Sequence, residues 1–460
     1  MGPQLTLEVT TITSGSGPTS KLCRWVCSTR HQDLPAEVRE ETLTLLYDQV
    51  GCMIASATLP SCQPVVDLVV KLGGPEECTI VGHPVRTSVL NAALANGAIG
   101  HGDEVDPTGQ RGTGHYAATT VPTALSVGQY VGASGEEFVR ALALGSEVAA
   151  RCQSVLAHYG TREQFVASVG GTLGAAVVAG LLLGLDADGM EHALGLAASG
   201  ACGISCHHLE ELHQIKSLNH GRAAQAGVLS ALLAQQGFHG PPEVLTVENG
   251  FFDAFLGLPW AGNDVAQGLG EEYLMRQIAY KRHPVGGPDQ TPVYALLELM
   301  KAHNLGADDI MEIQVSVSRH AFHIVMTNQH PSVHMETVLS LAAVYGEVAF
   351  KHIHDPIYRQ DPRFKAFRER ARILIIPRPQ PATFGDRLEM GITVRTQAGE
   401  TLRQDLRYPL MTAEEIQQKF RGLVGMRLGG DQVSALERKL KEVETVADVA
   451  PLINDLQIGY

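Results

Sequence analysis

The sequence predicts a mainly α-helical protein, in which a large all-helical domain is followed by a smaller α+β domain. Runs rich in Ala, Leu and Gly recur at helical spacing over residues 21–268. Alternation with a period of two then appears at Ile310–Ser318, which is typical of a strand. The chain has 460 residues, 44% hydrophobic and 18% charged, and this composition fits a globular protein with a large core.

The all-helical domain is expected after a Ser/Thr/Gly-rich tail at residues 1–20, which we expect to be disordered. Pro35 and the acidic residues after it favour a helix start, because the helix dipole stabilises negative charge there. Further helices are predicted at Pro64–Leu72, Ser88–Asn96, Ala117–Val131, Gly135–Cys152, Phe165–Gly184, Asp188–Ser199 and Ser217–Gln236. Several are apolar nearly all round, which predicts burial on every side or against a second subunit.

The α+β domain is expected over residues 269–408, with three or four antiparallel strands. Arg372–Ile376 reads as a strand that Pro377 ends, and Gln397–Glu400 predicts a hairpin turn between Arg387–Arg395 and Thr401–Arg407. Helices are predicted at Thr291–His303 and Met335–Val348. Residues 409–460 return to helical spacing, and we expect these C-terminal helices to pack on the first domain.

Composition narrows the class of protein. The net charge is −14 with no Lys/Arg block, which argues against a nucleic-acid or membrane partner. The eight cysteines are too sparse for a disulfide scaffold, and no signal-peptide pattern is present, so a cytoplasmic protein is expected. Cys202–His208 matches no common zinc spacing, and no phosphate loop, Rossmann fingerprint or nucleophile elbow occurs. We therefore expect neither a metal nor another cofactor.

The segment Asn96–His115 is the densest group of polar residues in the helical domain. One Gly-rich loop there carries His101, Asp103, Glu104, Asp106, Thr108, Arg111 and His115. Carboxylates, imidazoles and a guanidinium within a few residues suit proton transfer beside an anionic substrate. The alternative interpretation is a solvated loop with capping residues.

Three further groups carry chemistry. Lys216 and Asn219 open an Ala-rich helix, and a helix N-terminus with a lysine is an anion site unless the charge only solubilises the helix end. Lys281-Arg282-His283 precedes a Pro/Gly turn at the domain junction and suits a carboxylate clamp; the alternative is a hinge with surface charge. His323 follows the strand at residues 310–318, where a histidine is more often on the surface. The histidines His330, His334, His352 and His354 show no metal spacing.

At these segments the chain resembles the MmgE/PrpD family, which includes 2-methylcitrate dehydratase, cis-aconitate decarboxylase and iminodisuccinate epimerase. The resemblance spans Ser20 to about Leu456 and rests on four segments in order: Asn96–Asp106, Gly170–Leu185, Ile215–Ala224 and Lys281–Pro284. They resemble the family's Asn-Gly-x-x-x-His loop, its Gly-Thr-x-Gly-Ala-Ala helix, its Thr-Lys-x-x-His segment and its Lys-x-aromatic-Pro turn. The family fold that this implies is a large helical domain with a smaller α+β lid, often dimeric and cofactor-free.

The resemblance also implies roles for single residues. It places Glu104 at the first loop carboxylate, Thr108 at the loop threonine and His115 at the catalytic histidine. Lys216 and Lys281 fall at the two carboxylate-binding lysines. Two family histidines are absent, since Val166 stands at one and Gly286, or Gln290 in another register, at the other. Their substitutes in space are expected among His158, His283 and His323.

The hypothesis from the sequence is a cofactor-independent lyase for a small di- or tricarboxylate, with dehydration of a citrate-like hydroxy acid as the leading reaction. His115, Glu104, Lys216 and Lys281 are the expected catalytic residues. Substrate binding is expected to involve Thr108, Arg111, Arg282, His283 and His323. The alternatives are decarboxylation of a cis-aconitate-like acid, epimerisation of an amino-dicarboxylate such as iminodisuccinate, and an inactive helical scaffold. A homodimer with a small polycarboxylate as its ligand is expected.

Overall fold

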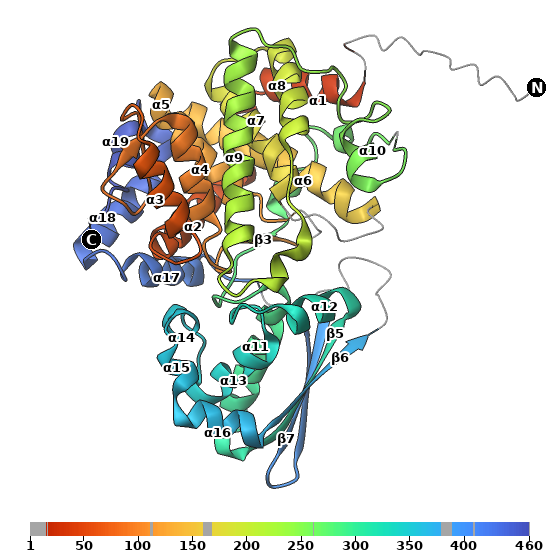
Figure 1. Cartoon of the computed structure of the whole chain (residues 1–460), viewed down its shortest axis with the longest axis vertical. Coiled ribbons are helices and arrows are strands. Elements are labelled where there is room, and N and C mark those ends of the chain that lie inside the picture. Colours follow the sequence, from red (N-terminus) through yellow and green to blue (C-terminus); the bar gives the residue numbers. More distant parts are fainter. Residues whose placement is uncertain are drawn as a thin grey trace, which may run out of the picture.

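The computed structural model describes residues 15, 17–110, 114–159, 168–260, 262–378, 389–407 and 410–459, except for the side chains of His207, His320, Glu389 and Arg407. It has a large helical part and a smaller part in which helices cover a β-sheet (Figure 1). The fold class predicted from the sequence is therefore confirmed.

The large part is built from helices of the first half of the chain. These are α1 (Pro18–Ser28), α2 (Ala36–Ser56), α3 (Gln63–Leu72), α4 (Val89–Gly100), α5 (Ala117–Val131), α6 (Gly135–Tyr159), α7 (Ser168–Leu182), α8 (Ala187–Gly200), α9 (Gln214–Gln235) and α10 (Phe251–Leu256). Nearly all of α7 is buried, as its apolar sequence predicts. The first helix starts at Pro18, within the stretch expected to be a tail, because Glu243 accepts hydrogen bonds from the backbone N–H groups of Gly17 and Thr19.

The helices α4 and α9 approach each other closely through a pair of glycines. A β-carbon on Gly97 would lie 2.8 Å from the α-carbon of Gly221, and one on Gly221 would lie 2.5 Å from the backbone oxygen of Leu94. Ser217 also donates a hydrogen bond to the backbone oxygen of Ala98 at 2.9 Å. This contact places the loop after α4 beside the first turns of α9.

The smaller part holds a four-stranded sheet in the order β6-β5-β7-β8, from β5 (Ile310–Ser318), β6 (Arg372–Arg378), β7 (Glu389–Thr396) and β8 (Thr401–Arg407). The prediction that all strands are antiparallel was wrong for one pair, since β5 and β6 are parallel. The chain between them returns through helices to the starting end of β5, as a parallel pair requires. The helices of this part are α11 (Gly287–Ala302), α12 (Arg319–Thr327), α13 (Met335–Tyr345), α14 (Phe350–His354), α15 (Ile357–Gln360) and α16 (Pro362–Arg370).

The last helices lie against the large part (blue in Figure 1) and are α17 (Ala413–Val424), α18 (Gly430–Lys441) and α19 (Ala450–Asn454). Phe420 of α17 stacks on Tyr47 of α2 with ring centroids 4.0 Å apart. Beside this pair, the Lys419 ammonium lies 2.8 Å from the buried carboxylate of Asp48. The domain boundaries drawn from the sequence stay predictions.

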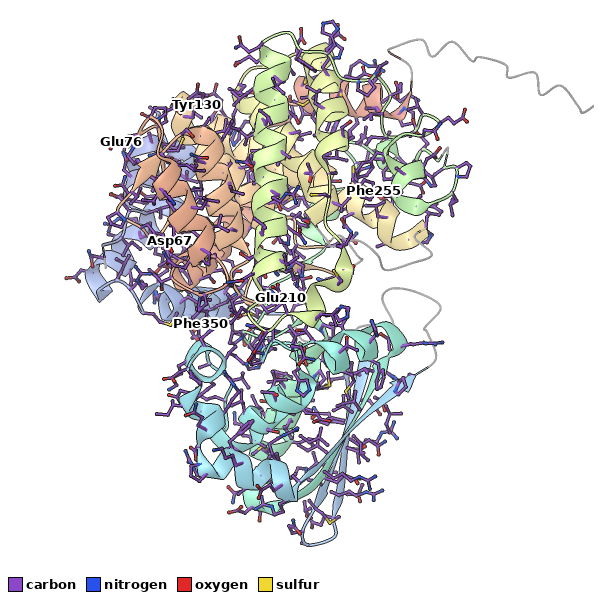
Figure 2. The ribbon with its side chains drawn as sticks, in the orientation of Figure 1. Asp67, Glu76, Tyr130, Glu210, Phe255 and Phe350 are labelled. Carbon is purple, nitrogen blue, oxygen red and sulfur yellow. The ribbon has the colours of Figure 1, made fainter. Side chains whose placement is uncertain are left out.

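Two pairs of short strands lie in the large part. β3 (Thr108–Gly109) pairs antiparallel with β4 (Ile278–Ala279), so Thr108 lies opposite Ala279; β1 (Cys78–Thr79) and β2 (Arg86–Thr87) form a separate pair. Glu210 and Phe350 mark the junction from its two sides in Figure 2. Within the described residues, we find no helix with the length and apolar character needed to cross a bilayer.

Candidate active site

Five residues from three distant segments meet at the junction of the two parts. Glu104 and Asp106 lie in the loop between α4 and β3, His115 precedes α5, Lys216 is in the first turn of α9, and Lys281 follows β4 by two residues. The Lys281 side chain is 1% exposed and that of Glu104 3%, whereas Lys216 and His115 are 13% and 12% exposed. The fold therefore brings together all four residues that the sequence predicted to be catalytic.

The carboxylate of Glu104 bridges the two lysines. Lys216 Nζ donates to Glu104 Oε1, and Lys281 Nζ lies 2.7 Å from Glu104 Oε2. Lys281 Nζ is also 3.5 Å from Asp106 Oδ1. The β3–β4 pairing explains this meeting, because it fixes the segment before Lys281 against the loop that carries both carboxylates.

His115 is oriented by Asp106. The distance from His115 Nδ1 to Asp106 Oδ2 is 2.9 Å, and His101 Nδ1 lies 3.0 Å from the same oxygen. The His220 ring packs 4.6 Å from that of His101, and Thr119 Oγ1 is 3.0 Å from His220 Nδ1. An ionised Asp106 accepts the Nδ1 proton of His115, which leaves the lone pair of His115 Nε2 available as a base.

The surroundings fix the charges of these groups. Burial opposes ionisation of Glu104, but Lys216 and Lys281 outweigh it and hold the pKa of Glu104 well below its usual value. Burial also opposes the charge on Lys281, yet Glu104 and Asp106 raise its pKa to about 12. Burial lowers the pKa of His115 to about 4 despite Asp106. At neutral pH Glu104 and Asp106 are thus ionised, Lys281 is charged and His115 is neutral.

The loop that carries Glu104 and Asp106 is held from two sides. Lys419 of α17 donates a 2.8 Å hydrogen bond to the backbone oxygen of Val105, the residue between the two carboxylates. Gln49 of α2 donates to the backbone oxygen of Gly100 at the end of α4. Rigid helices therefore position the loop, which suits a site that needs fixed geometry.

Several histidines of the cluster were not selected from the sequence. His213, Lys216 and His220 recur at helical spacing along the start of α9, and that pattern could have been used to find the two histidines. His330 and His354 come from the smaller part, and their spacing gave no signal. The His330 ring lies 4.9 Å from that of His213, and His354 Nε2 lies 3.2 Å from Asp103 Oδ1.

The residues predicted to bind substrate have varied surroundings. Thr108 is half-buried in β3, and Arg111 lies outside the described residues. Arg282 forms an ion pair with Glu415 of α17, and its guanidinium lies 5.3 Å from the Tyr294 ring centroid. His283 is half-buried, and burial lowers its pKa to about 4. His323 is exposed on α12, with its ring 5.5 Å from that of His208. Their binding roles stay predictions.

Gly286 is one of two alternative positions at which the resemblance implies an absent family histidine, the other being Gln290. A β-carbon there would lie 2.7 Å from Asp289 Oδ2. The Asp289 side chain is fully buried, and neither carboxyl oxygen has a hydrogen-bond partner among the described residues. Gln290 holds the turn itself, since its amide donates to the backbone oxygens of His283 and Val285. Val166, the other departure, lies outside the described residues, as do its neighbours.

Two groups have donor atoms close enough for a metal ion: His101, Glu104 and His213, and His101, Asp106 and His115, each with ligand atoms within 4.8 Å of one another. The same carboxylates already face the lysine ammoniums, however. Lys281 lies near both of them, and its charge would repel a divalent cation. The donor set therefore suits a carboxylate anion better than a metal.

Comparison with known proteins places the chain in a family. Residues 20–261 match the MmgE/PrpD N-terminal domain and residues 283–444 the MmgE/PrpD C-terminal domain, with Lys281 between the two matches. A cis-aconitate decarboxylase-like protein of Aspergillus oryzae is 24% identical, covering 97% of this chain and 98% of its own. A cis-aconitate decarboxylase of Aspergillus terreus is 24% identical over 95% of both chains, and the Homo sapiens enzyme is 24% identical over 81% of both. The chain belongs to the MmgE/PrpD family.

Proposed function

We propose that this protein is a lyase that acts on a small polycarboxylate with its own side chains. The observation that carries the proposal is the convergence of Lys216, Lys281 and His115 around two buried carboxylates at the junction of the two parts. Cations and a neutral base side by side suit a substrate that carries both a carboxylate and an acidic carbon.

The lysines supply binding and electrostatic stabilisation. Each ammonium has three donors, and Glu104 uses one donor of each. The remaining donors are available for a substrate carboxylate, and Glu104 keeps the two ammoniums at a fixed spacing. Negative charge that develops next to this carboxylate during the reaction is stabilised by the same ammoniums.

The leading reaction in this proposal is decarboxylation of a cis-aconitate-like acid, because the relatives described above carry that name. The C–C bond to one carboxylate breaks and carbon dioxide leaves. The electron pair moves through the double bond, and a proton from an imidazolium adds to the carbon at its far end. His115, recharged with a proton from water, is the proposed donor.

A second candidate is dehydration of a citrate-like hydroxy acid, which is the leading reaction in the hypothesis from the sequence. The low pKa of His115 favours it, since a neutral imidazole is ready to remove a proton at pH 7. Here His115 takes the proton next to a carboxylate, the double bond forms, and the hydroxyl leaves as water after it is protonated. Epimerisation of an amino-dicarboxylate would use the same base and also stays a prediction.

Product analysis tests the proposal. The purified protein is incubated separately with cis-aconitate, citrate, 2-methylcitrate and iminodisuccinate, and products are followed by NMR and carbon dioxide release. We expect turnover of at least one, and a loss of at least about a hundredfold in His115→Ala with the fold retained. His303→Gln, at an exposed position, is the matched control. If no polycarboxylate is turned over or raises the melting temperature, the scaffold alternative replaces the lyase.

We also propose that the protein acts as a homodimer. Apolar side chains stand exposed in the segment between α8 and α9, with Ile204 58%, Leu209 70% and Leu212 51% exposed. Clustered exposed apolar residues are typical of an interaction surface. Sedimentation velocity at micromolar concentration should show a dimer, and a monomer would contradict the proposal.

A further inference from the structure

A second pair of buried imidazoles lies beside the proposed catalytic cluster. His213 occupies the N-cap position of α9 and His330 lies between α12 and α13, so the pair joins the two parts of the molecule. Their ring centroids are 4.9 Å apart. His213 Nε2 lies 3.4 Å from Glu104 Oε1, the oxygen that also receives Lys216.

The backbone at His213 is held in an unusual conformation. Its φ is +60° and its ψ is 21°, in the left-handed region that glycine and asparagine adopt more easily than histidine. The side chain is nevertheless buried, and its Nε2 has no hydrogen-bond partner among the described residues. A strained backbone that keeps an unsatisfied imidazole beside the carboxylate that spaces the two lysines indicates a functional requirement rather than a packing one.

On the His330 side, further polar contacts extend from the pair toward solvent. His330 Nδ1 lies 2.6 Å from Ser332 Oγ, which leaves Nε2 as its second proton site. Beyond it, the ring of His354 is 6.2 Å away, and His354 Nε2 faces Asp103 at 3.2 Å. The His354 side chain is 18% exposed, so this row of histidines runs from the buried cluster toward solvent.

The excess negative charge around the His213–His330 pair favours uptake of a proton when an anionic substrate binds. Among the described residues, Lys216 and Lys281 are the lysines paired with Glu104 and Asp106, Asp103 faces His354, and a polycarboxylate would add further negative charge. The groups that face His213 are His330, Glu104, Lys216 and His101, and burial holds it neutral in the free protein. His330 faces Asp103, His354, Glu104 and Arg359, and burial likewise lowers its pKa, to about 4. An anion placed beside these rings favours their protonated form.

We propose that His213 is a second proton-transferring residue, and that the His213–His330 pair takes up a proton when a polycarboxylate binds. This inference rests on the proposed function. In a dehydration, the His213 imidazolium gives its proton to the departing hydroxyl while His115 takes the carbon-bound proton, so that water leaves and both histidines return to their starting state after one proton exchange with solvent. In a decarboxylation His115 forms the new C–H bond, and the His213 imidazolium passes on the solvent proton that recharges His115.

The conformation of His213 provides an unusually clean variant. His213→Asn and His213→Gly remove the imidazole but suit the left-handed backbone, so both should fold with an unchanged or higher melting temperature. We expect both to lose turnover by at least about a hundredfold, and imidazole added to His213→Gly to restore part of it. A merely structural histidine would instead lower the melting temperature and show no rescue.

Calorimetry tests the proton uptake with tricarballylate, a saturated tricarboxylate that has no hydroxyl or double bond to react. Titrations at pH 7 in phosphate and in Tris, which differ in ionisation enthalpy, give the number of protons taken up. We expect about one for the natural protein and for His239→Gln, an exposed control, and about none for His213→Asn.

The outcomes separate this inference from the function beneath it. Binding without proton uptake, or uptake that persists in His213→Asn, overturns the role of His213 but leaves the lyase proposal in place. Absence of tricarballylate binding together with absence of turnover overturns both. Turnover that survives His213→Asn within a few-fold overturns the second proton transfer alone.

Discussion

Replacing Lys281 with methionine should destabilise the protein strongly, although the variant loses a single positive charge and keeps a long side chain. The Lys281 side chain is 1% exposed and its ammonium lies 2.7 Å from Glu104 and 3.5 Å from Asp106. At an effective dielectric constant of about 20, the first contact alone has a Coulomb energy of about 6 kcal/mol. Desolvation offsets part of this, and removing one partner of a buried pair costs about 3–5 kcal/mol.

The lower end of that range applies here, because Lys216 still neutralises Glu104 in the variant. With an unfolding entropy of about 2.1 cal/mol/K per residue over a cooperative unit of roughly 250 residues, a loss of about 3 kcal/mol lowers the melting temperature by about 6 °C. Differential scanning calorimetry at pH 7 measures this shift. Lys439→Met is the matched control, since Lys439 pairs with Asp455 on the surface and should change stability by less than about 1 kcal/mol.

A double-mutant cycle decides whether the buried pair is the cause. Glu104→Gln added to Lys281→Met removes the carboxylate that has lost one of its two cations, so the two losses should not add, with a coupling energy of about 1–3 kcal/mol. Additive losses, or a Lys281→Met variant as stable as Lys439→Met, would refute the reasoning. The turnover of Lys281→Met should fall in either case if this ammonium binds substrate.

Further predictions concern buried groups outside the pair. Burial, and then the charge of Glu104, raise the pKa of Asp289 well above its usual value, so the folded protein holds a proton that the unfolded chain releases above about pH 4. The contribution of Asp289 to the free energy of unfolding therefore falls as pH rises above about 4. Asp289→Asn should raise the melting temperature at pH 7 and lose this advantage at pH 4. An equal shift of the melting temperature at both pH values would contradict the raised pKa of Asp289. Phe420→Ala should cost about 3–5 kcal/mol in urea unfolding, because its fully buried ring stacks on Tyr47, while Phe238→Ala, 57% exposed, should cost little. Arg282→Met should lower stability modestly through loss of its ion pair with the partly exposed Glu415, by about 1 kcal/mol, and a change above about 3 kcal/mol would show a larger role for the junction contact.

Much of this fold could be read from the sequence because local patterns carried it. The alternation at Ile310–Ser318 gave the bounds of β5, and the turn around Gly399, with φ +86°, formed the expected hairpin. The parallel pairing of β5 and β6 could not be read, because strand direction depends on the path of the helices between them. The capping of α1 by Glu243 was hidden for the same reason, since the two segments lie more than two hundred residues apart.

The residues of the candidate active site also divide into those that local sequence could predict and those that depend on distant contacts. Lys216 and Lys281 were selected from their local sequence, and the fold joins them through Glu104. His330 and His354 carried no local signal, because only the docking of the smaller part brings them to His213 and Asp103. His283 and His323 had the better local context, yet one is enclosed in its turn and the other faces solvent. Local sequence therefore selected Lys216, Lys281 and His115, which the fold brings together, but not the histidines that reach the cluster from the smaller part.

The order in which the chain is synthesised gives the buried carboxylates a further significance. Glu104 and Asp106 leave the ribosome long before Lys281, and Lys419, which fastens the loop between them through Val105, follows later still. A nascent chain that has reached only α10 therefore carries two acids at its centre with Lys216 as their cation. Native packing of this loop has to wait until α17 has been made, so any product shortened before that helix would be a folding intermediate rather than a smaller enzyme.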